Sequence, residues 1–231
     1  MKPDSQVLYS GRVLKGIIFD LDGTLTDSIR VFYEAFRRVS IAVGVNIRKE
    51  DIFGPLAEGT EPWDQAFPMD LPDRERTMRE FRRVMKPAYV EATSRVRVLP
   101  GVAEMLARLR QHGIRLGLVT DSAASSLEPL RSEDLIEHFA AIVTRDDGFP
   151  RKPHSQGLRE CLRRMEVDPE HAMIVGDTLM DIRVGKDVGV LTVGVLTGLA
   201  NRSQLEAAQP TVLVEDVTCI PDLLNLNELD G

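Results

Sequence analysis

The chain has 231 residues, of which 43% are hydrophobic and 28% charged, and its formal net charge at pH 7 is −7. This length allows one sizeable core, or one core with a modest inserted domain, and the composition is ordinary for a globular protein. The negative charge argues against a nucleic-acid partner. No apolar run reaches the roughly 18 residues that a membrane span needs.

The N-terminal residues 1–16 have no apolar core of the signal-peptide type, so we expect a cytoplasmic protein without a membrane partner. Residues 1–13 are expected to form either a loose tail or an extra edge element. The two cysteines, Cys161 and Cys219, lie far apart and outside any metal-ligand pattern. The four histidines share no motif, so the sequence does not predict a zinc site.

Six short apolar runs are typical of buried strands, and they lie at 17–19, 114–119, 140–143, 172–175, 190–195 and 211–214. Between them, apolar side chains recur at helical spacing in 102–112 and 158–165. Alternating buried strands and helices imply a parallel sheet that is covered on both faces. The sequence therefore predicts an α/β fold with a doubly wound, Rossmann-like parallel sheet.

The segment 28–97 breaks this alternation, because it shows helical patterns and no convincing strand. Its apolar side chains fall on helical faces at Ile29, Phe32, Phe36 and Val39, and again at Met78, Phe81, Val84 and Met85. We interpret 27–97 as an α-helical cap domain inserted into a Rossmann-like catalytic core formed by 1–26 and 98–231. Hinges are expected near Thr26-Asp27 and Leu99-Pro100-Gly101.

The strongest chemical signal is Asp20-Leu21-Asp22-Gly23-Thr24, which directly follows an apolar run. Ligands of a doubly wound sheet bind beyond the carboxyl ends of its strands. If the backbone stays near-extended, Asp20 and Asp22 point to the same side, and such close carboxylates raise each other's pKa unless a cation lies between them. Gly23 allows a tight departure from the strand. The alternative interpretation is an acidic turn that bonds only to its own backbone.

A second acidic pair, Asp177 and Asp181, follows the apolar run at 172–175. Asp177 could simply cap the next helix. Asp181 lies four residues further on, so the two carboxylates would share one face once the helix begins, where like charges repel. This spacing favours a metal ion or a lysine as a partner for the pair.

Two other strand ends supply complementary groups. Thr120-Asp121-Ser122 brings hydroxyl groups to the end of one apolar run, and the helix after it would aim its N–H groups at an anion. Lys152-Pro153 follows the loop after another apolar run, 140–143, and Pro153 suits the first turn of the next helix. A lone Lys-Pro is a weak motif. Together, however, the four strand ends hold a nucleophile, a proton donor, an anion cradle and metal ligands, which phosphoryl transfer to a carboxylate requires.

The order Asp20-x-Asp22-Gly23-Thr24, then Thr120, then Lys152-Pro153, then Asp177-x-x-x-Asp181 resembles the four motifs of the haloacid dehalogenase superfamily. The helical insert between the first two motifs is similar to the cap of its phosphoglycolate phosphatase and beta-phosphoglucomutase branch. The resemblance implies a phosphatase that hydrolyses a small phosphomonoester, phosphoglycolate or a sugar phosphate, through an aspartyl-phosphate intermediate.

The resemblance also implies catalytic roles. Asp20 would attack phosphorus, and Asp22 would protonate the leaving alkoxide and then deprotonate the hydrolytic water. Thr120 would hydrogen-bond the phosphoryl group, and Lys152 would neutralise its charge and help orient Asp20.

The metal that the resemblance implies is Mg²⁺, which suits hard oxygen ligands. It would bind Asp20, Asp177, the backbone carbonyl of Asp22 and the phosphate. Asp181 would support the lysine or a metal-bound water. Gly23, Thr24, Asp121 and Ser122 are expected to support the site, although Asp121 stands where many relatives have Asn, which would alter the charge of the site.

Four alternatives compete with a phosphatase. A haloacid dehalogenase proper needs no magnesium and no acid at Asp22. A phospho-accepting receiver module uses similar groups in another order and has no helical insert, and intact motifs argue against a catalytically silent binding relative. A phosphomutase of the beta-phosphoglucomutase type shares every core motif and stays open, because only the cap could distinguish it.

The expected partner is a small phosphorylated metabolite, contacted by cap residues between Gly54 and Phe67, among them Trp63. A cap that closes over the site would admit small substrates and reject phosphoproteins. The sequence leaves open which metabolite is the substrate, and whether the chain is a monomer or a homodimer.

Overall fold

The fold is built on a central sheet of six parallel strands in the order β5-β4-β3-β6-β7-β8. The structure, a computed structural model, describes residues 7–60 and 62–226. The strands are β3 (Gly16–Phe19), β4 (Arg115–Val119), β5 (Phe139–Val143), β6 (Ala172–Gly176), β7 (Leu191–Val195) and β8 (Val212–Val214). All six lie where the apolar runs predicted them, to within one residue at each end, and the predicted α/β fold is confirmed.

Helices cover both faces of the sheet, because successive side chains of a strand point to opposite sides. Ile17 and Phe19 belong to one hydrophobic core with α5 (Val102–Gln111) and α10 (Ile220–Leu223). Ile18 belongs to a second core, on the opposite face, with α7 (Gln156–Met165) and α8 (Leu179–Val188). The strands are buried on both sides, which is why they read as continuous apolar runs.

The remaining helices of this part of the chain are short. They are α6 (Glu128–Ser132) and α9 (Arg202–Ala208), with the 3-10 helices η1 (Ala124–Leu127), η2 (Ile136–His138), η3 (Arg145–Asp147), η4 (Pro169–His171) and η5 (Val217–Cys219). Of the helices that the structure describes, none is long and apolar enough to cross a membrane.

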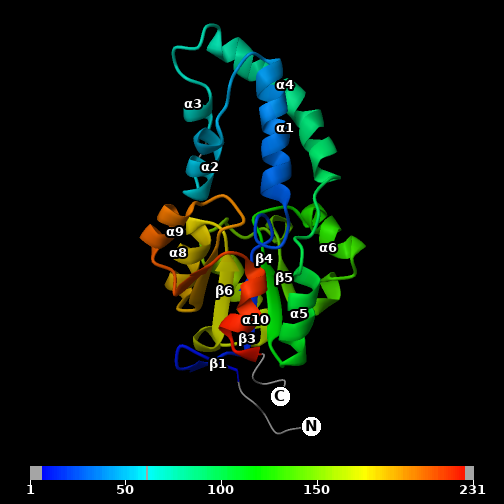
Figure 1. Cartoon of the computed structure of the whole chain (residues 1–231), viewed down its shortest axis with the longest axis vertical. Coiled ribbons are helices and arrows are strands. Elements are labelled where there is room, and N and C mark those ends of the chain that lie inside the picture. Colours follow the sequence, from blue (N-terminus) through cyan, green and yellow to red (C-terminus); the bar gives the residue numbers. More distant parts are fainter. Residues whose placement is uncertain (1–6, 61, 227–231) are drawn as a thin grey trace.

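Between β3 and α5 the described chain forms four helices that stand on the carboxyl ends of the strands (Figure 1). They are α1 (Ser28–Ala42), α2 (Lys49–Ala57), α3 (Trp63–Ala66) and α4 (Arg74–Thr93). We call residues 28–93 the helical insert. Its hydrophobic core is distinct from those of the sheet and includes the ring pairs Phe36–Phe81 and Phe67–Phe81, with centroids 5.6 Å and 5.0 Å apart.

The two connections to the insert run side by side. Thr26 and Val98 form an antiparallel bridge, and the backbone N–H of Leu99 donates to the carbonyl of Leu25 over 2.9 Å. The carboxylate of Asp27 accepts a hydrogen bond of 2.8 Å from the backbone N–H of Arg97. The insert is thus attached at one narrow base, where the sequence predicted hinges.

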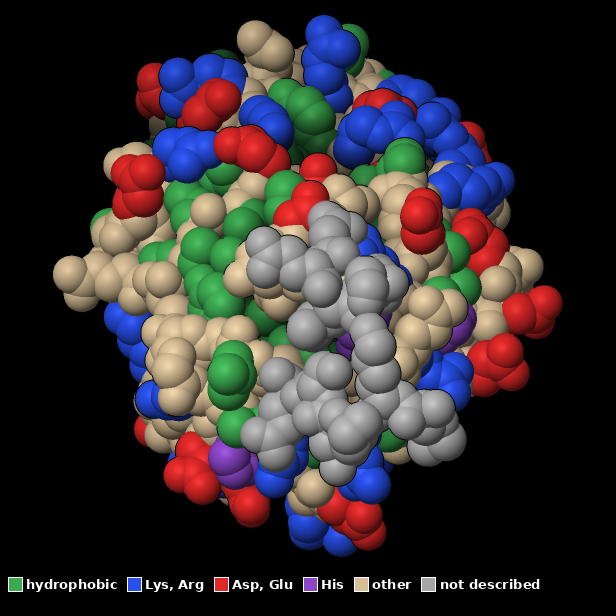
Figure 2. Space-filling view, turned by 60° about the horizontal axis from the view of Figure 1, so that its bottom comes forward, with side chains coloured by type: hydrophobic (Ala, Val, Ile, Leu, Met, Phe, Trp, Pro, Cys, Tyr) green, Lys and Arg blue, Asp and Glu red, His purple; other side chains and the backbone are tan. Residues whose placement is uncertain are grey.

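The described N-terminal residues form a separate small hairpin. β1 (Leu8–Tyr9) and β2 (Arg12–Val13) pair antiparallel with each other and not with the main sheet. Residues 7–13 are therefore neither a loose tail nor an edge strand of that sheet, and residues 1–6 lie outside the described part. Figure 2 shows this lower end of the molecule, where acidic and basic side chains are interspersed around the rim.

Candidate active site

Every catalytic residue that the motifs predicted lines one cavity of about 240 Å³ at the carboxyl end of the sheet. Asp20 follows β3, Thr120 follows β4 and Asp177 follows β6, while Lys152 arrives on the loop after β5. We call this space the catalytic cavity. Its wall also includes residues of the helical insert, namely Ile29, Leu56, Gly59 and Thr60. The cavity therefore lies between the sheet and the insert.

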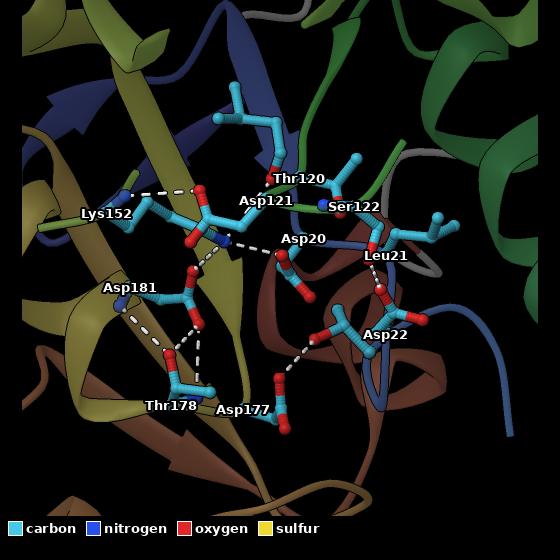
Figure 3. A network of polar contacts seen from close by, with 12 residues as sticks. Asp20, Leu21, Asp22, Thr120, Asp121, Ser122, Lys152, Asp177, Thr178 and Asp181 are labelled. Carbon is cyan, nitrogen blue, oxygen red and sulfur yellow. Dashed lines mark hydrogen bonds and ion pairs between the residues drawn. The ribbon is translucent and has the colours of Figure 1, made fainter. Parts of the chain in front are cut away.

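Lys152 joins two of the acidic motifs (Figure 3). Its ammonium Nζ donates to Asp20 Oδ1 over 2.5 Å and to Asp181 Oδ1 over 2.6 Å, and its side chain is 7% exposed. Burial opposes the charged form of Lys152, but the carboxylates of Asp181 and Asp20 outweigh burial and raise the pKa of Lys152 well above its ordinary value. The lysine is therefore a fixed positive charge beside the predicted nucleophile.

Asp181 is itself held by the start of α8. The hydroxyl of Thr178 donates to Asp181 Oδ2 over 2.6 Å, and the backbone N–H of Asp181 donates back to the Thr178 hydroxyl over 3.3 Å. This is a capping box, which satisfies N–H groups that a helix end leaves unpaired. Since Oδ1 bonds to Lys152 and Oδ2 bonds to the cap, Asp181 connects the start of α8 to Lys152.

The spacing predicted that Asp177 and Asp181 share one face of a helix. They do not, because α8 begins only at Leu179. The Asp177 side chain instead accepts hydrogen bonds from the backbone N–H of Leu199, over 2.7 Å, and from the Thr24 hydroxyl, over 3.4 Å. A Cβ placed on Gly198 would lie 1.8 Å from Asp177 Oδ2, so only glycine permits this approach.

Burial dominates the electrostatics of the acidic groups. It raises the pKa of Asp20 well above its ordinary value; Lys152 counteracts the rise, and neighbouring carboxylates add to it. Burial, with the charge of Asp181, raises the pKa of Asp177 to about 7. Buried carboxylates of this kind favour a proton or a cation.

Asp22 lies on the side of the catalytic cavity that carries the hydroxyls of Ser122 and Thr120. The Ser122 hydroxyl donates to Asp22 Oδ2 over 2.5 Å, and the backbone N–H of Ser122 donates to Thr120 Oγ1 over 3.1 Å. Asp121 accepts a hydrogen bond of 3.2 Å from the backbone N–H of Lys152, and burial raises the pKa of Asp121 although Lys152 opposes the rise. Asp20 and Asp22 therefore share one cavity but have different partners.

One further local prediction was wrong. Pro153 is not in the first turn of the next helix, since α7 begins only at Gln156. Helical structure does follow Thr120-Asp121-Ser122, as η1 and the five-residue α6.

Sequence reasoning missed several residues of the site. Leu199 and Gly198 hold Asp177 from a loop far along the chain, and Arg151 lines the catalytic cavity beside Lys152. Thr178 was visible as a Thr-x-x-Asp capping signature. The side chain of Trp63, which we expected to contact substrate, lies outside what the structure describes.

Asp20 and Asp177 line the cavity with carboxylate oxygens, the kind of ligand that a hard divalent cation prefers. Among the residues described, no three Asp, Glu, His or Cys side chains form a cluster that could hold a metal ion by themselves. An ion here would need backbone, water or substrate oxygens besides the two carboxylates. Mg²⁺ is commonly bound in this way, by one or two carboxylates together with waters and phosphate oxygens.

Comparison with known proteins places these motifs in a family. The model of the haloacid dehalogenase-like hydrolases matches residues 17–195. The pyrophosphatase PpaX of Bacillus cereus (strain B4264) is 29% identical over 213 residues, covering 91% of this chain and 97% of that protein. PpaX of Bacillus thuringiensis (strain Al Hakam) is 28% identical over 213 residues, with the same coverage of both chains.

Solved structures share the fold. A predicted phosphoglycolate phosphatase from Haemophilus somnus superposes with a TM-score of 0.72 at 22% identity, covering 91% of this chain and 97% of that one. A beta-phosphoglucomutase from Clostridium difficile gives 0.66 at 20% identity, covering 94% and 100%. The predicted family, fold and phosphatase type of enzyme are confirmed. The chain belongs to the haloacid dehalogenase-like hydrolases, as the match over most of its length shows.

Proposed function

We propose that this hydrolase is a magnesium-dependent phosphatase that cleaves a small phosphomonoester through an aspartyl-phosphate intermediate. The observation that carries the proposal is the buried carboxylate of Asp20, which Lys152 holds 2.5 Å away in a cavity shared with Asp22. A nucleophile that is fixed before the substrate arrives avoids the entropic cost of orienting it during the reaction.

The chemistry would proceed in two halves. An oxygen of Asp20 attacks phosphorus, the bond from phosphorus to the leaving oxygen breaks, and protonated Asp22 gives its proton to that oxygen. Ionised Asp22 then takes a proton from a water molecule that attacks the phosphorus of the aspartyl phosphate. The bond between Asp20 and phosphorus breaks, and inorganic phosphate leaves. The Ser122 hydroxyl, bonded to Asp22 Oδ2, orients this acid.

The other residues of the cavity would bind charge. Lys152 and Arg151 supply positive charge, and the Thr120 hydroxyl supplies a donor for the phosphoryl oxygens. Asp20, Asp177 and the backbone carbonyl of Asp22 would hold the magnesium ion, which when bound stabilises negative charge on the phosphoryl oxygens.

The helical insert would act as a cap domain spanning 27–97. Support comes from the catalytic cavity, whose wall combines residues of the sheet with Leu56, Gly59 and Thr60 of the insert. The insert stands over the carboxyl ends of the strands in Figure 1. The cavity of about 240 Å³ beneath it suits a small phosphorylated metabolite and not a folded phosphoprotein. Three of the insert's cavity residues fall in the segment 54–67, where we expected substrate contacts.

Inorganic pyrophosphate is a second candidate substrate. The relatives from Bacillus are named pyrophosphatases, and Arg151 adds a cationic side chain to the cavity that could bind a second phosphoryl group. Attack by Asp20 would be the same, and only the leaving group would differ. A phosphomutase also remains a candidate, since a beta-phosphoglucomutase shares the fold.

The test is a substrate panel with the purified protein and Mg²⁺. p-Nitrophenyl phosphate, phosphoglycolate, hexose phosphates and pyrophosphate are assayed for phosphate release, and glucose 1-phosphate is assayed for isomerisation. We expect Mg²⁺-dependent release of phosphate from monoesters. The intermediate at Asp20 should be trapped as an acyl phosphate that is stable in acid or can be reduced by borohydride. Isomerisation without net release would indicate a mutase, and activity confined to pyrophosphate would indicate a pyrophosphatase.

A further inference from the structure

A second cavity, also of about 240 Å³, lies beside the catalytic cavity at the base of the helical insert. We propose that it binds the leaving group of the substrate, and that this group is neutral and rich in hydroxyls, as in a sugar or polyol phosphate. The proposal rests on the proposed phosphatase function. We call this space the leaving-group pocket. Its lining residues are Asp22, Ser28, Phe32, Thr93, Ser94, Val96, Ser125, Ser126, Glu128 and Pro129.

The position of Asp22 links the two cavities. Asp22 lines both of them, whereas Asp20 lines only the catalytic cavity. An acid that protonates a leaving oxygen must reach the atom between phosphorus and the organic group. With phosphorus on the Asp20 side of Asp22, the organic group extends to the other side, into the leaving-group pocket. Its volume lies below the range typical of sites for drug-sized ligands, so it suits a small group.

The hydroxyl of Ser28, which has no hydrogen-bond partner, is the feature that points to a ligand. The Ser28 side chain is 1% exposed, and its hydroxyl is the one buried side-chain polar atom in the described part of the chain that lacks a hydrogen-bond partner. A buried polar group without a partner costs about 1–3 kcal/mol, so such groups are rare unless a ligand or water completes them. A hydroxyl group of the substrate would both donate to and accept from Ser28.

The chemistry of the lining selects the kind of group. Five of the ten lining residues carry hydroxyls: Ser28, Thr93, Ser94, Ser125 and Ser126. Phe32 adds an aromatic side chain held by stacking on Tyr89, with ring centroids 4.5 Å apart. Such a combination of hydroxyls and an apolar surface matches a polyol, which has hydroxyl groups and C–H groups on one carbon chain.

The charges that line the leaving-group pocket disfavour an anionic leaving group. Among the residues that the structure describes, no Lys or Arg lines the leaving-group pocket, and the two charged residues of its lining are acidic, Asp22 and Glu128. The catalytic cavity, by contrast, has Arg151 and Lys152 for the phosphoryl group. A carboxylate or a second phosphate in the pocket would face the acidic groups of Asp22 and Glu128, while Arg131, which lies 3.9 Å from Glu128, is not part of the lining. The pocket therefore disfavours phosphoglycolate and pyrophosphate.

The test compares specificity constants, kcat/KM, for substrates that differ only in the leaving group. The set is sorbitol 6-phosphate and ribose 5-phosphate as neutral polyols, phosphoglycolate and pyrophosphate as anions, phosphoethanolamine as a cation, and p-nitrophenyl phosphate as the reference. We expect the better polyol phosphate to exceed phosphoglycolate, pyrophosphate and phosphoethanolamine at least about tenfold, the discrimination that about 1.4 kcal/mol provides.

Two variants locate the selectivity. Glu128→Lys places a cation at the rim and should shift the ratio of polyol to anionic substrates about tenfold toward the anions. The matched control is Glu75→Lys, an equal change of charge in the first turn of α4, where Glu75 pairs with Arg79 as Glu128 pairs with Arg131; it should leave the ratio unchanged. Ser28→Ala should lower the preference for the polyol over p-nitrophenyl phosphate roughly three- to tenfold, the worth of one hydrogen bond.

The outcomes separate the two proposals. If no substrate, including p-nitrophenyl phosphate, is hydrolysed with Mg²⁺, the proposed function fails. If p-nitrophenyl phosphate is hydrolysed but an anionic or cationic leaving group is preferred, or Glu128→Lys and Glu75→Lys behave alike, the pocket does not select a neutral polyol while the phosphatase stands.

Discussion

The carboxylate of Asp181 accepts a hydrogen bond from Lys152 over 2.6 Å and is itself fully buried. Its other oxygen belongs to the capping box at the start of α8. One side chain therefore stabilises the start of α8 and also fixes the position of Lys152. Helix stability and the geometry of the site are coupled through it, and this coupling can be measured.

Replacing Asp181 should cost more stability than replacing its capping partner. Asp181→Ala removes one carboxylate from a buried ion pair, which costs about 3–5 kcal/mol when one partner is lost. Thr178→Ala removes only the cap, worth about 1 kcal/mol. Urea unfolding of both variants gives the two free energies. Equal losses would show that Lys152 does not depend on Asp181, since Asp20 would then suffice as its partner.

Asp20→Asn should abolish turnover and leave the fold intact. The amide of Asn is a poor nucleophile, and loss of a covalent nucleophile can lower kcat by as much as about 10⁶-fold. Circular dichroism should be unchanged, and phosphate release from p-nitrophenyl phosphate should fall to background. Asp187→Asn, at an exposed carboxylate on α8, is the control and should keep full activity. Near-normal turnover of Asp20→Asn would exclude the aspartyl phosphate.

The effect of Asp22→Asn should depend on the leaving group. General acid–base help is worth about 10²- to 10⁴-fold, but p-nitrophenolate leaves readily without a proton. We therefore expect a large loss of kcat for alkyl phosphates and a smaller loss for p-nitrophenyl phosphate, with KM little changed. Equal losses for both kinds of substrate would contradict the role of Asp22 as proton donor to the leaving oxygen.

The pH dependence of stability should reveal the buried acid Asp177. In the metal-free protein its pKa is raised to about 7, above its value in the unfolded chain, so the native state binds more protons between about pH 4 and pH 7. The free energy of unfolding should therefore fall as pH rises through this range. Thermal unfolding in EDTA measures the fall, and Asp177→Asn should reduce it, leaving the part that comes from the raised pKa of Asp20.

Added Mg²⁺ should reverse that trend. The cation competes with the proton for Asp177, so its stabilisation of the protein should grow from pH 5 to pH 8 and disappear in Asp177→Ala. Ca²⁺ should bind but support turnover poorly, because its looser coordination misplaces the attacking oxygen. Full activity after exhaustive EDTA treatment, or equal Mg²⁺ stabilisation at both pH values, would refute the metal site.

Local patterns in the chain were sufficient for the sheet and for the position of the motifs. Strands buried on both faces must be continuously apolar, so their runs are visible without knowledge of the fold. Parallel strands bring their carboxyl ends to one edge, so groups at 20, 120 and 177 could be placed together before any distance was known. The helical faces of the insert were visible because its apolar side chains recur at helical spacing.

Contacts between distant segments depended on the tertiary structure. The loop at Gly198 and Leu199 contacts Asp177 because folding brings together turns that lie far apart in the sequence. The bonds of Lys152 to Asp20 and Asp181 were expected from the family resemblance, and only the folded chain gives their geometry. The unpartnered hydroxyl of Ser28 is invisible in sequence, since a serine at the start of a helix is ordinary there. Whether a polar atom has a partner depends on what packs around it, and packing is a property of the folded chain.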